Sequence, residues 1–441
     1  MPPTPGPWPH EPQVEAVTTG ASGAHFPTSH DDGPLTVVSD IQESGKNFLL
    51  LMPVEIIANI LIEWSIMEWP APAIARQVCR CLKEITDSSP RLWSKLFLPS
   101  YSPATVDDVC SWLRCAKAVP KEICLDTEDI CIISAALEGA KDATSLIYRI
   151  PIFTEIPDDQ QKLIQLPMPM PKLRHLRLDT SNVYDFMSMR NIFGPYNSCS
   201  AQFPCLTILH LVFVDLAGFH IMPGLFPAIR RLALHFVCGP VLNLIQVCSG
   251  SLEDLRGTSN LSYRGQSIQR DRIFLPKLKV LILCETPGIV PHLEAPALRL
   301  ICANLDEIDG ATVPFGSVVE WATRLQSKDI TDQLINMPQL RHLMLFQRME
   351  TLKLCFESLR DRPNICPYLQ SIEVADFADA GSETKVDTHF KDLLKACVAP
   401  RAEKVPGFAL QFVENYVQTT RFEQYHATYV RSFVVMCHYL S

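Results

Sequence analysis

The sequence lacks a run of basic residues and a long uninterrupted apolar run. Its 441 residues include 39 Lys and Arg against 48 Asp and Glu, a formal net charge of -9. Proteins that bind nucleic acid through its phosphates need clustered positive charge, so nucleic acid is not expected as the main partner. The most apolar stretch, 203–236, is interrupted by Asp215, Arg230 and Arg231 and by histidines and prolines. No membrane-spanning segment is therefore expected.

The usual signatures of catalysis and of metal binding are also missing. The sequence contains no G-x-S-x-G elbow, phosphate-binding loop, H-E-x-x-H motif or dinucleotide fingerprint. Its 16 cysteines are scattered, without paired C-x-x-C motifs at zinc-binding distance. Asp158 and Asp159 stand in what reads as a surface loop, where both carboxylates would be solvated. We expect no enzyme activity, cofactor or metal site of its own.

The first 46 residues are rich in Pro, Gly, Ser, Thr and His and show little apolar periodicity. Such a composition cannot offset the entropy of ordering the chain, so residues 1–46 are expected to be a disordered tail. The start, Met-Pro-Pro-Thr-Pro-Gly, lacks the basic and then apolar layout of a secretory signal. Together with unpaired cysteines, this predicts a cytoplasmic and/or nuclear protein.

Residues 47–99 read as a helical domain of three short helices. Pro53 suits a first helical position, and Ile56, Ile57, Ile60 and Leu61 are expected on one face of the first helix. The second helix is expected to carry apolar side chains through Ile74, Val78, Leu82 and Ile85. Ser89 and Pro90 begin the third, which presents Leu92, Trp93 and Leu96. So much apolar surface in so short a segment requires a partner to cover it.

These motifs resemble the F-box. The matching pieces are Pro-Val-Glu-Ile-Ile at 53–57, Val-Cys-Arg at 78–80 and Ser-Pro-Arg-Leu-Trp at 89–93. Met52 replaces the usual Leu, a change that conserves volume, and Leu82 replaces the usual Trp, which removes aromatic area. The resemblance implies docking on the Skp-type adaptor of a Skp–cullin–F-box ubiquitin ligase. The expected adaptor-binding residues are Met52, Pro53, Ile56, Ile57, Ile60, Val78, Leu82, Leu92 and Trp93. The alternative is an ordinary helical subdomain packed on the rest of the chain.

From Pro171 the sequence repeats the pattern Pro-x-hydrophobe-x-x-hydrophobe-x-hydrophobe. Copies start at Pro171, Pro204, Pro227, Pro276 and Pro338, and weaker copies at Gly250, Pro296 and Pro367. Most starts lie 20 to 29 residues apart, the spacing of leucine-rich repeats. The 42 residues between Pro296 and Pro338 read as two repeats, with a degenerate copy near 318–325.

Alternating leucines point to one side of a short strand, and stacked repeats share one core. The expected fold is therefore α/β: a three-helix F-box, then a leucine-rich-repeat solenoid with a parallel β-sheet over 100–375. The alternative is a generic α/β domain with leucine-rich strands. Residues 376–441 are expected to form an acidic loop, 376–387, and a helical C-terminal cap that begins near Thr388 and includes the aromatic-rich end of the chain. A separate binding element is the other reading of that end.

Residues that flank the paired leucines should face outward from the sheet. As a row they are the candidate surface for a target protein, with Met344 and Phe346 expected to be exposed anchors. The candidates are His175, Arg177, Asp179, His210, Arg231, His235, Arg256, His342, Met344 and Phe346. A solvated sheet face without a partner is the alternative.

By resemblance, the chain is expected to be a non-catalytic substrate-recognition subunit of a ubiquitin ligase. The F-box would bind the Skp-type adaptor and, through it, the cullin core, and the repeats would bind an unidentified protein substrate. The alternative is a scaffold or binding protein whose degenerate F-box joins no ligase.

Overall fold

The computed structural model describes residues 52–67, 70–100, 103–150, 162–180, 187–193, 202–258, 272–284, 289–303, 315–323, 330–346, 349–375 and 388–413. The expected disordered tail, the expected acidic loop and the pair Asp158 and Asp159 lie outside these residues. The chain divides into two compact units, Met1–Pro53 and Val54–Ser441. Every helix and strand given below belongs to the second unit.

The helical segment consists of α3 (Val54–Met67), α4 (Ala71–Val78), α5 (Arg80–Ser88) and the 3-10 helix η1 (Pro90–Trp93). The expected second helix is therefore two helices, because Cys79 is extended, with φ -158° and ψ 165°, and caps α5 by accepting from the Leu82 N–H at 3.5 Å. The expected third helix is a single 3-10 turn. Leu96, predicted to lie on that helix, lies in a strand instead.

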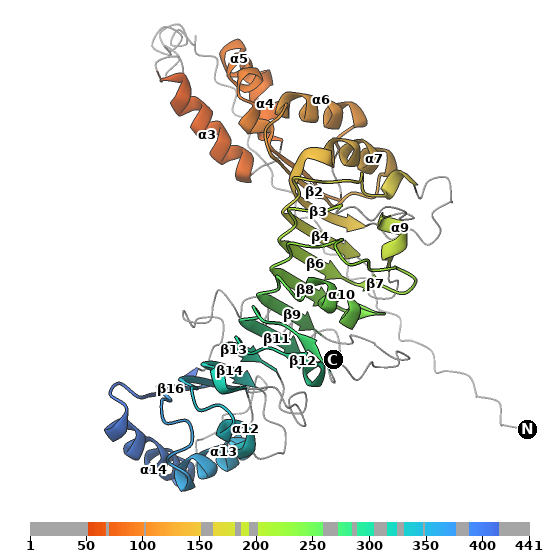
Figure 1. Cartoon of the computed structure of the whole chain (residues 1–441). Coiled ribbons are helices and arrows are strands. Elements are labelled where there is room, and N and C mark those ends of the chain that lie inside the picture. Colours follow the sequence, from red (N-terminus) through yellow and green to blue (C-terminus); the bar gives the residue numbers. More distant parts are fainter. Residues whose placement is uncertain are drawn as a thin grey trace, which may run out of the picture. The chain divides into compact units, whose positions relative to one another are not determined.

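The main element is a 13-stranded sheet whose paired strands are all parallel and follow one another in chain order (Figure 1). The strands are β1 (Lys95–Leu98), β2 (Lys121–Leu125), β3 (Ala143–Ile150), β4 (His175–Thr180), β6 (Ile208–Val212), β8 (Arg231–His235), β9 (Asp254–Thr258), β11 (Val280–Cys284), β13 (Leu300–Cys302), β14 (Glu320–Thr323), β15 (His342–Phe346), β16 (Ser371–Ala375) and β17 (Ala409–Val413). The expected α/β class and parallel sheet are confirmed.

Each sequence repeat supplies one strand of this sheet. The eight repeat starts precede β4, β6, β8, β9, β11, β13, β15 and β16, and β14 occupies the place of the predicted degenerate copy. The strand positions predicted from the repeat are thus confirmed. Three strands before the first repeat and β17 after the last extend the sheet at both ends.

The repeat pattern has a local structural cause. In several repeats the first hydrophobe donates its backbone N–H to the carbonyl three residues earlier, as Leu173 does to Met170 at 3.3 Å and Leu340 to Met337 at 3.1 Å. Pro171 and Pro338 then occupy the second position of a four-residue turn, where the φ angle of proline fits. The turn carries the chain into the strand that follows.

The hydrophobic positions of the repeat form the core. The first hydrophobe is 0 % exposed at Leu173, Leu206, Ile229, Leu252, Leu278, Leu298, Val318, Leu340 and Leu369. The second hydrophobe lies at one register position and is at most 1 % exposed at Leu176, Leu209, Leu232, Leu255, Leu281, Ile301, Trp321, Leu343 and Ile372. Because each strand buries the same two positions against its neighbours, the core continues from repeat to repeat.

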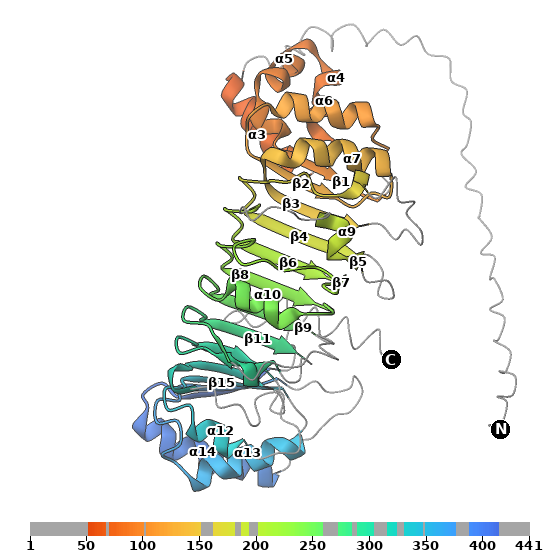
Figure 2. The same cartoon turned by 45° about the vertical axis from the view of Figure 1, so that its right-hand side comes forward.

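Short helices and two small sheets connect the strands (Figure 2). The helices are α6 (Val106–Ala116), α7 (Ile130–Gly139), η2 (Ala140–Asp142), η3 (Lys162–Ile164), α9 (Met189–Phe193), α10 (Val241–Cys248), η4 (Val290–His292), η5 (Phe315–Ser317), α12 (Thr331–Ile335), α13 (Met349–Asp361) and α14 (Thr388–Lys404). The small parallel pairs are β5 (Met187–Ser188) with β7 (Val214–Asp215) and β10 (Ile273–Phe274) with β12 (Leu293–Glu294). No helix in the described ranges is long and apolar enough to cross a membrane.

The C-terminal end agrees with the prediction only in part. α14 begins at Thr388, as expected, and packs on α13. Arg401 is buried in α14, where its guanidinium donates to the carbonyl of Ile365 at 3.0 Å. The stretch 409–413, expected to be helical, is instead β17, which pairs with β16. An available sheet edge satisfies the backbone of a short aromatic segment better than an isolated helix does.

One glycine is required by the backbone between β8 and α10. Gly239 has φ +90°, and a Cβ atom there would lie 2.7 Å from the backbone nitrogen of Ala217. We expect Gly239→Ala to destabilise the protein by about 2–3 kcal/mol, because strain at positive φ adds to a collision with backbone. Urea denaturation followed by circular dichroism would measure the loss.

Gly218 provides the matched control. It also has a positive φ, +70°, but no heavy atom lies within 4 Å of its ideal Cβ. Gly218→Ala should therefore cost only about 1 kcal/mol, from the backbone conformation alone. Equal losses for the two variants would contradict the collision at Gly239.

Candidate functional site

The helical segment divides its apolar residues between an inner and an outer surface. On α3, Ile57 and Leu61 are buried, whereas Ile56 and Ile60 are exposed. The expectation that all four share one face was wrong, because positions one residue apart differ by about 100° around a helix. α3 packs its inner side against α4, α5 and η1.

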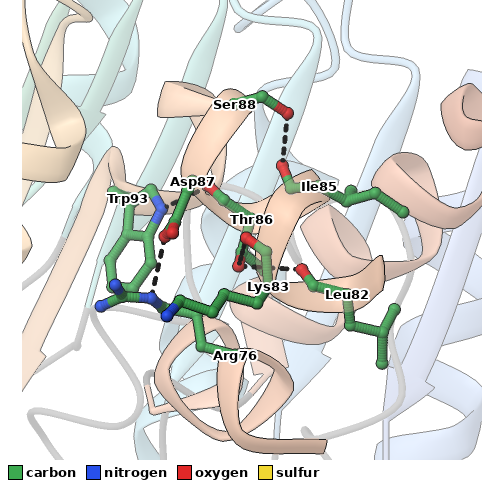
Figure 3. A network of polar contacts seen from close by, with 8 residues as sticks. All are labelled: Arg76, Leu82, Lys83, Ile85, Thr86, Asp87, Ser88 and Trp93. Atoms are coloured by element: carbon green, nitrogen blue, oxygen red, sulfur yellow. Dashed lines mark hydrogen bonds and ion pairs between the residues drawn. The ribbon is translucent and has the colours of Figure 1, made fainter. Parts of the chain in front are cut away.

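Trp93 belongs to the inner surface. It is 3 % exposed, and its ring meets that of Trp112 on α6 edge-on, with centroids 4.9 Å apart. Its indole N–H donates to the carbonyl of Thr86 at 2.9 Å. Arg76 lies over the same ring, 5.7 Å from its centroid, and pairs with Asp87 at 2.8 Å (Figure 3). Trp93 thus joins α4, α5 and α6 from within.

The nine predicted adaptor-binding residues therefore do not form one accessible surface. Ile57, Leu82, Leu92 and Trp93 are buried within the chain, and the expectation that another protein covers them was wrong. Pro53, Ile56, Ile60 and Val78 are exposed, and Met52 is half-buried. The buried four belong to the core of the segment, which the sequence pattern cannot separate from its outer surface because both are apolar.

The exposed apolar residues of α3 and α4 are a possible contact surface. Val54, Ile56, Ile60, Ile74 and Val78 are each between 42 and 62 % exposed. Exposed apolar side chains on two packed helices favour contact with another protein, because their burial releases water. We name these five residues the α3–α4 apolar surface.

A hollow adjoins this surface at Ile74. Its volume is about 550 Å³, and its walls come from α4, α5, α6 and η1. The rings of Trp93 and Trp112 line it together with the polar side chains of Arg76 and Lys83. An inserted side chain of a partner would meet two aromatic residues there, together with the basic Arg76 and Lys83 and the acidic Asp108.

The second candidate surface lies on the sheet, where strand register brings the predicted outward residues together. His175 stands beside Ile208, then Arg231 and Asp254, along one line across β4, β6, β8 and β9. The next lines across the same strands are Arg177, His210, Ala233 and Arg256, and then Asp179, Val212, His235 and Thr258. Seven of the ten predicted target-binding residues are thus neighbours on these four strands.

Charges in this cluster pair with one another. Asp254 lies between two arginines, 2.9 Å from Arg231 Nε and 3.0 Å from Arg256 Nη2. Asp179 lies 2.8 Å from Arg177 Nη2. Most of these side chains are buried, including Asp179, Asp254 and Arg256, while Arg231 is exposed. The cluster therefore offers a partner few free charges.

Two histidines are held neutral beside these arginines. His210 and His235 lie with ring centroids 4.7 Å apart, and His235 Nδ1 is 2.6 Å from the Thr258 hydroxyl. Burial, then the neighbouring positive groups, lower the pKa of His210 to about 2 and that of His235 to about 4. Burial also lowers the pKa of His175. At neutral pH these rings can donate or accept hydrogen bonds but carry no charge.

The cluster has unused hydrogen-bonding atoms. Among the described residues, neither His210 Nε2 nor Arg177 Nε has a hydrogen-bond partner, although both atoms are buried. Buried polar atoms without partners cost free energy, which a bound group could recover. No group of three His, Cys, Asp or Glu side chains within the described part of the chain is placed to hold a metal ion.

The predicted outward row is not continuous along the sheet. On the line of Arg177 and His210, strands β11, β13 and β14 present Ile282, Cys302 and Ala322, all buried. Beyond them, His342 Nδ1 is 2.8 Å from the Ser371 hydroxyl. Met344 is 1 % exposed, so its predicted role as an exposed anchor was wrong. The side chain of Phe346 lies outside the described residues.

Sequence reasoning missed some residues of these surfaces. The hydroxyl of Thr258 contacts His235. The two residues are register partners on β8 and β9, so an alignment of the repeats could have revealed Thr258. The basic residues that directly precede several strands were also overlooked. In five repeats a basic residue follows the first hydrophobe, a fixed position that a repeat alignment would have shown. A comparison with models of known protein families finds no match for this sequence, and a search of curated proteins finds none either.

Proposed function

We propose that this chain is a substrate-recognition subunit of a Skp–cullin–F-box ubiquitin ligase. In this proposal the helical segment 54–93 binds the Skp-type adaptor, and the parallel sheet belongs to a leucine-rich-repeat solenoid that binds a target protein. The solenoid assignment is supported by one strand per repeat and by the proline-led turn before it. The contribution to ubiquitin transfer would be proximity, since a bound target is held at high effective concentration near a separate enzyme.

The observation that carries adaptor binding is the α3–α4 apolar surface. Val54, Ile56 and Val78 come from the pieces that resemble the F-box, and all five members are exposed while Ile57, Leu61 and Trp93 are packed inside. Covering them with an adaptor helix would remove apolar area from water at about 25 cal/mol per Å². The hollow beside Ile74 would admit a side chain from the same partner.

We expect Ile56→Asp together with Ile60→Asp to abolish co-purification with the Skp-type adaptor. Two carboxylates in an apolar interface would be desolvated without partners, which costs at least about 2–3 kcal/mol and weakens binding fifty-fold or more. Both side chains are about half exposed, so the fold should persist. Co-expression followed by affinity purification and immunoblotting measures the loss.

The matched control is Ile335→Asp together with Leu354→Asp. These residues are 50 and 46 % exposed on α12 and α13, away from the helical segment in the sequence. The control should retain the adaptor fully. If the α3 variant bound the adaptor as tightly as the control variant does, adaptor docking through α3 would be excluded. Ile57→Asp is unsuitable, because Ile57 is buried and its replacement would disturb the fold.

The rival function is a scaffold whose helical segment only covers the end of the sheet. The burial of Leu82, Leu92 and Trp93, and the packing of Trp93 on Trp112, favour this reading, because residues expected at a partner interface are used internally. Affinity purification with mass spectrometry separates the two. Recovery of adaptor and cullin supports the ligase subunit, whereas target proteins without either support the scaffold.

A further inference from the structure

A basic hollow opens where the chain enters strands β11 to β15. Its volume is about 560 Å³. Lys279, Arg299 and Arg341 line it, each being the residue directly before a strand. Val319 holds the equivalent place before β14. This group belongs to neither surface described above, and we name it the basic hollow.

Backbone hydrogen bonds fix the spacing of these positions. Arg299 N–H donates to the carbonyl of Lys279 at 2.9 Å, Val319 N–H to that of Arg299 at 2.8 Å, and Arg341 N–H to that of Val319 at 2.8 Å. Neighbouring strands lie about 4.8 Å apart, so the line from Lys279 to Arg341 spans about 14 Å. The positive charges therefore lie along a line and not around a point.

Ala297 and Ser317 make room beside this line, because their side chains are short. Two positions earlier in each repeat stand Ala297, Ser317 and Gln339, which line the same hollow. The neighbouring repeats carry the long side chains of Lys277 and Tyr368 at this position. The hollow is thus a consequence of side-chain size at one repeat position.

Among the described residues, one of the three cations of the hollow has an ion-pair partner and the other two have none. Glu253, directly before β9, lies 2.9 Å from Lys279 and 3.9 Å from Arg230. Within the described part of the chain, no carboxylate forms an ion pair with Arg299 or Arg341. Two exposed arginines that have no ion-pair partner among the described residues favour a negatively charged ligand in this hollow.

We propose that the basic hollow binds an extended, carboxylate-rich segment of a partner protein. An extended peptide advances about 3.3 Å per residue and points alternate side chains the same way, so about four residues would match the line of cations. Arginine presents a planar fork of donors that carboxylates accept in pairs. The Gln339 amide adds a neutral donor at the rim. This inference does not depend on ligase membership, since it concerns different residues.

The test uses the full-length chain and a fluorescein-labelled peptide of alternating Glu and Ser, with fluorescence anisotropy as the readout. The same peptide with Gln in place of Glu should bind at least about tenfold more weakly, and raising the salt concentration should weaken the Glu peptide. No adaptor is present in the assay, so a negative result bears on the hollow and leaves adaptor docking untouched.

The decisive variant is Arg299→Glu with Arg341→Glu, which should weaken binding of the Glu peptide by about tenfold or more. The control, Arg174→Glu with Arg230→Glu, makes the same change of net charge at the same repeat position outside the hollow, and should weaken it less than about threefold. Arg299→Gln with Arg341→Gln, a milder pair, should still lose most of the binding. All four arginines are exposed, so the variants should fold.

Three results would overturn the proposal. One is an equal loss of affinity for the Glu peptide in the hollow and control variants, which would mean that the overall charge of the protein, and not the hollow, attracts the peptide. Another is undiminished binding of the Gln peptide. The third is a marked preference for a phosphoserine peptide or a single-stranded oligonucleotide over the Glu peptide, which would assign the hollow to phosphate.

Discussion

Replacing Trp93 with alanine is expected to destabilise the helical segment by about 3–5 kcal/mol, the usual cost of removing a large buried aromatic side chain. The ring fills the space between α5 and α6, stacks edge-on with Trp112 and donates to the Thr86 carbonyl. Its loss would leave a cavity and would remove one of the two donors to the Thr86 carbonyl, which also accepts from the Ser89 N–H at 3.3 Å. Hydrogen exchange at the amides of α4 and α5, with circular dichroism during thermal unfolding, measures the effect.

Phe97 provides the control for this experiment. It lies four residues further on, in β1, and is 44 % exposed. Phe97→Ala should cost less than about 1 kcal/mol. If Trp93→Ala instead preserved stability and removed adaptor binding, Trp93 would be an interface residue and its internal packing would be unimportant. The outcome therefore separates the structural role from the role that the F-box resemblance implies.

Acidification is the second change with a large expected effect. The unfolded chain binds protons at His210 and His235 as the pH falls below their ordinary pKa of 6.5, whereas the folded chain does not, because its pKa values are about 2 and about 4. Stability is therefore fully present above pH 6.5 and is lost as the pH falls. We expect a loss of roughly 3 kcal/mol by about pH 4.5, allowing for partial contact of these rings with solvent.

Urea denaturation midpoints at neutral and at acid pH measure this loss. The window ends at the ordinary pKa of a Glu carboxyl, 4.5, and lies above that of an Asp carboxyl, 3.8, so histidine titration dominates it. His210→Leu should reduce the loss of stability on acidification by about half. It should change the free energy of unfolding little at neutral pH, because no described residue forms a hydrogen bond with His210 Nε2. His220→Leu, at an exposed position, is the control and should leave the slope unchanged. If the stability of the unmodified protein did not change between neutral and acid pH, the two rings would bind protons in the folded chain as readily as in the unfolded chain.

The two predictions concern different parts of the same chain and together test how it is built. Trp93 tests whether the helical segment forms its own core. The histidine pair tests whether the polar cluster on β4 to β9 excludes water, as the burial of its side chains indicates. A cluster that excludes water and pairs its own charges would present mainly the exposed Arg231 to a target.

The helical segment marks where sequence reasoning reached its limit. A period near 3.6 identifies apolar positions, but Ile56 and Ile57 satisfy the same pattern and only packing assigns one to each side. The break at Cys79 also had no sequence signal, since neither Gly nor Pro stands there. Pro90, whose φ is restricted by its ring, marked the start of η1 correctly.

The sequence by itself determined the repeats, their strands and their buried leucines. These follow from local rules: proline starts a turn, alternation sends leucine side chains to one face, and identical units bury identical positions. Only the tertiary structure decided which residues remain accessible. Met344 and Trp93 are buried, whereas Ile60, Arg299 and Arg341 are exposed. Exposure depends on what the neighbouring segments cover, and a pattern read along one segment carries no information about its neighbours.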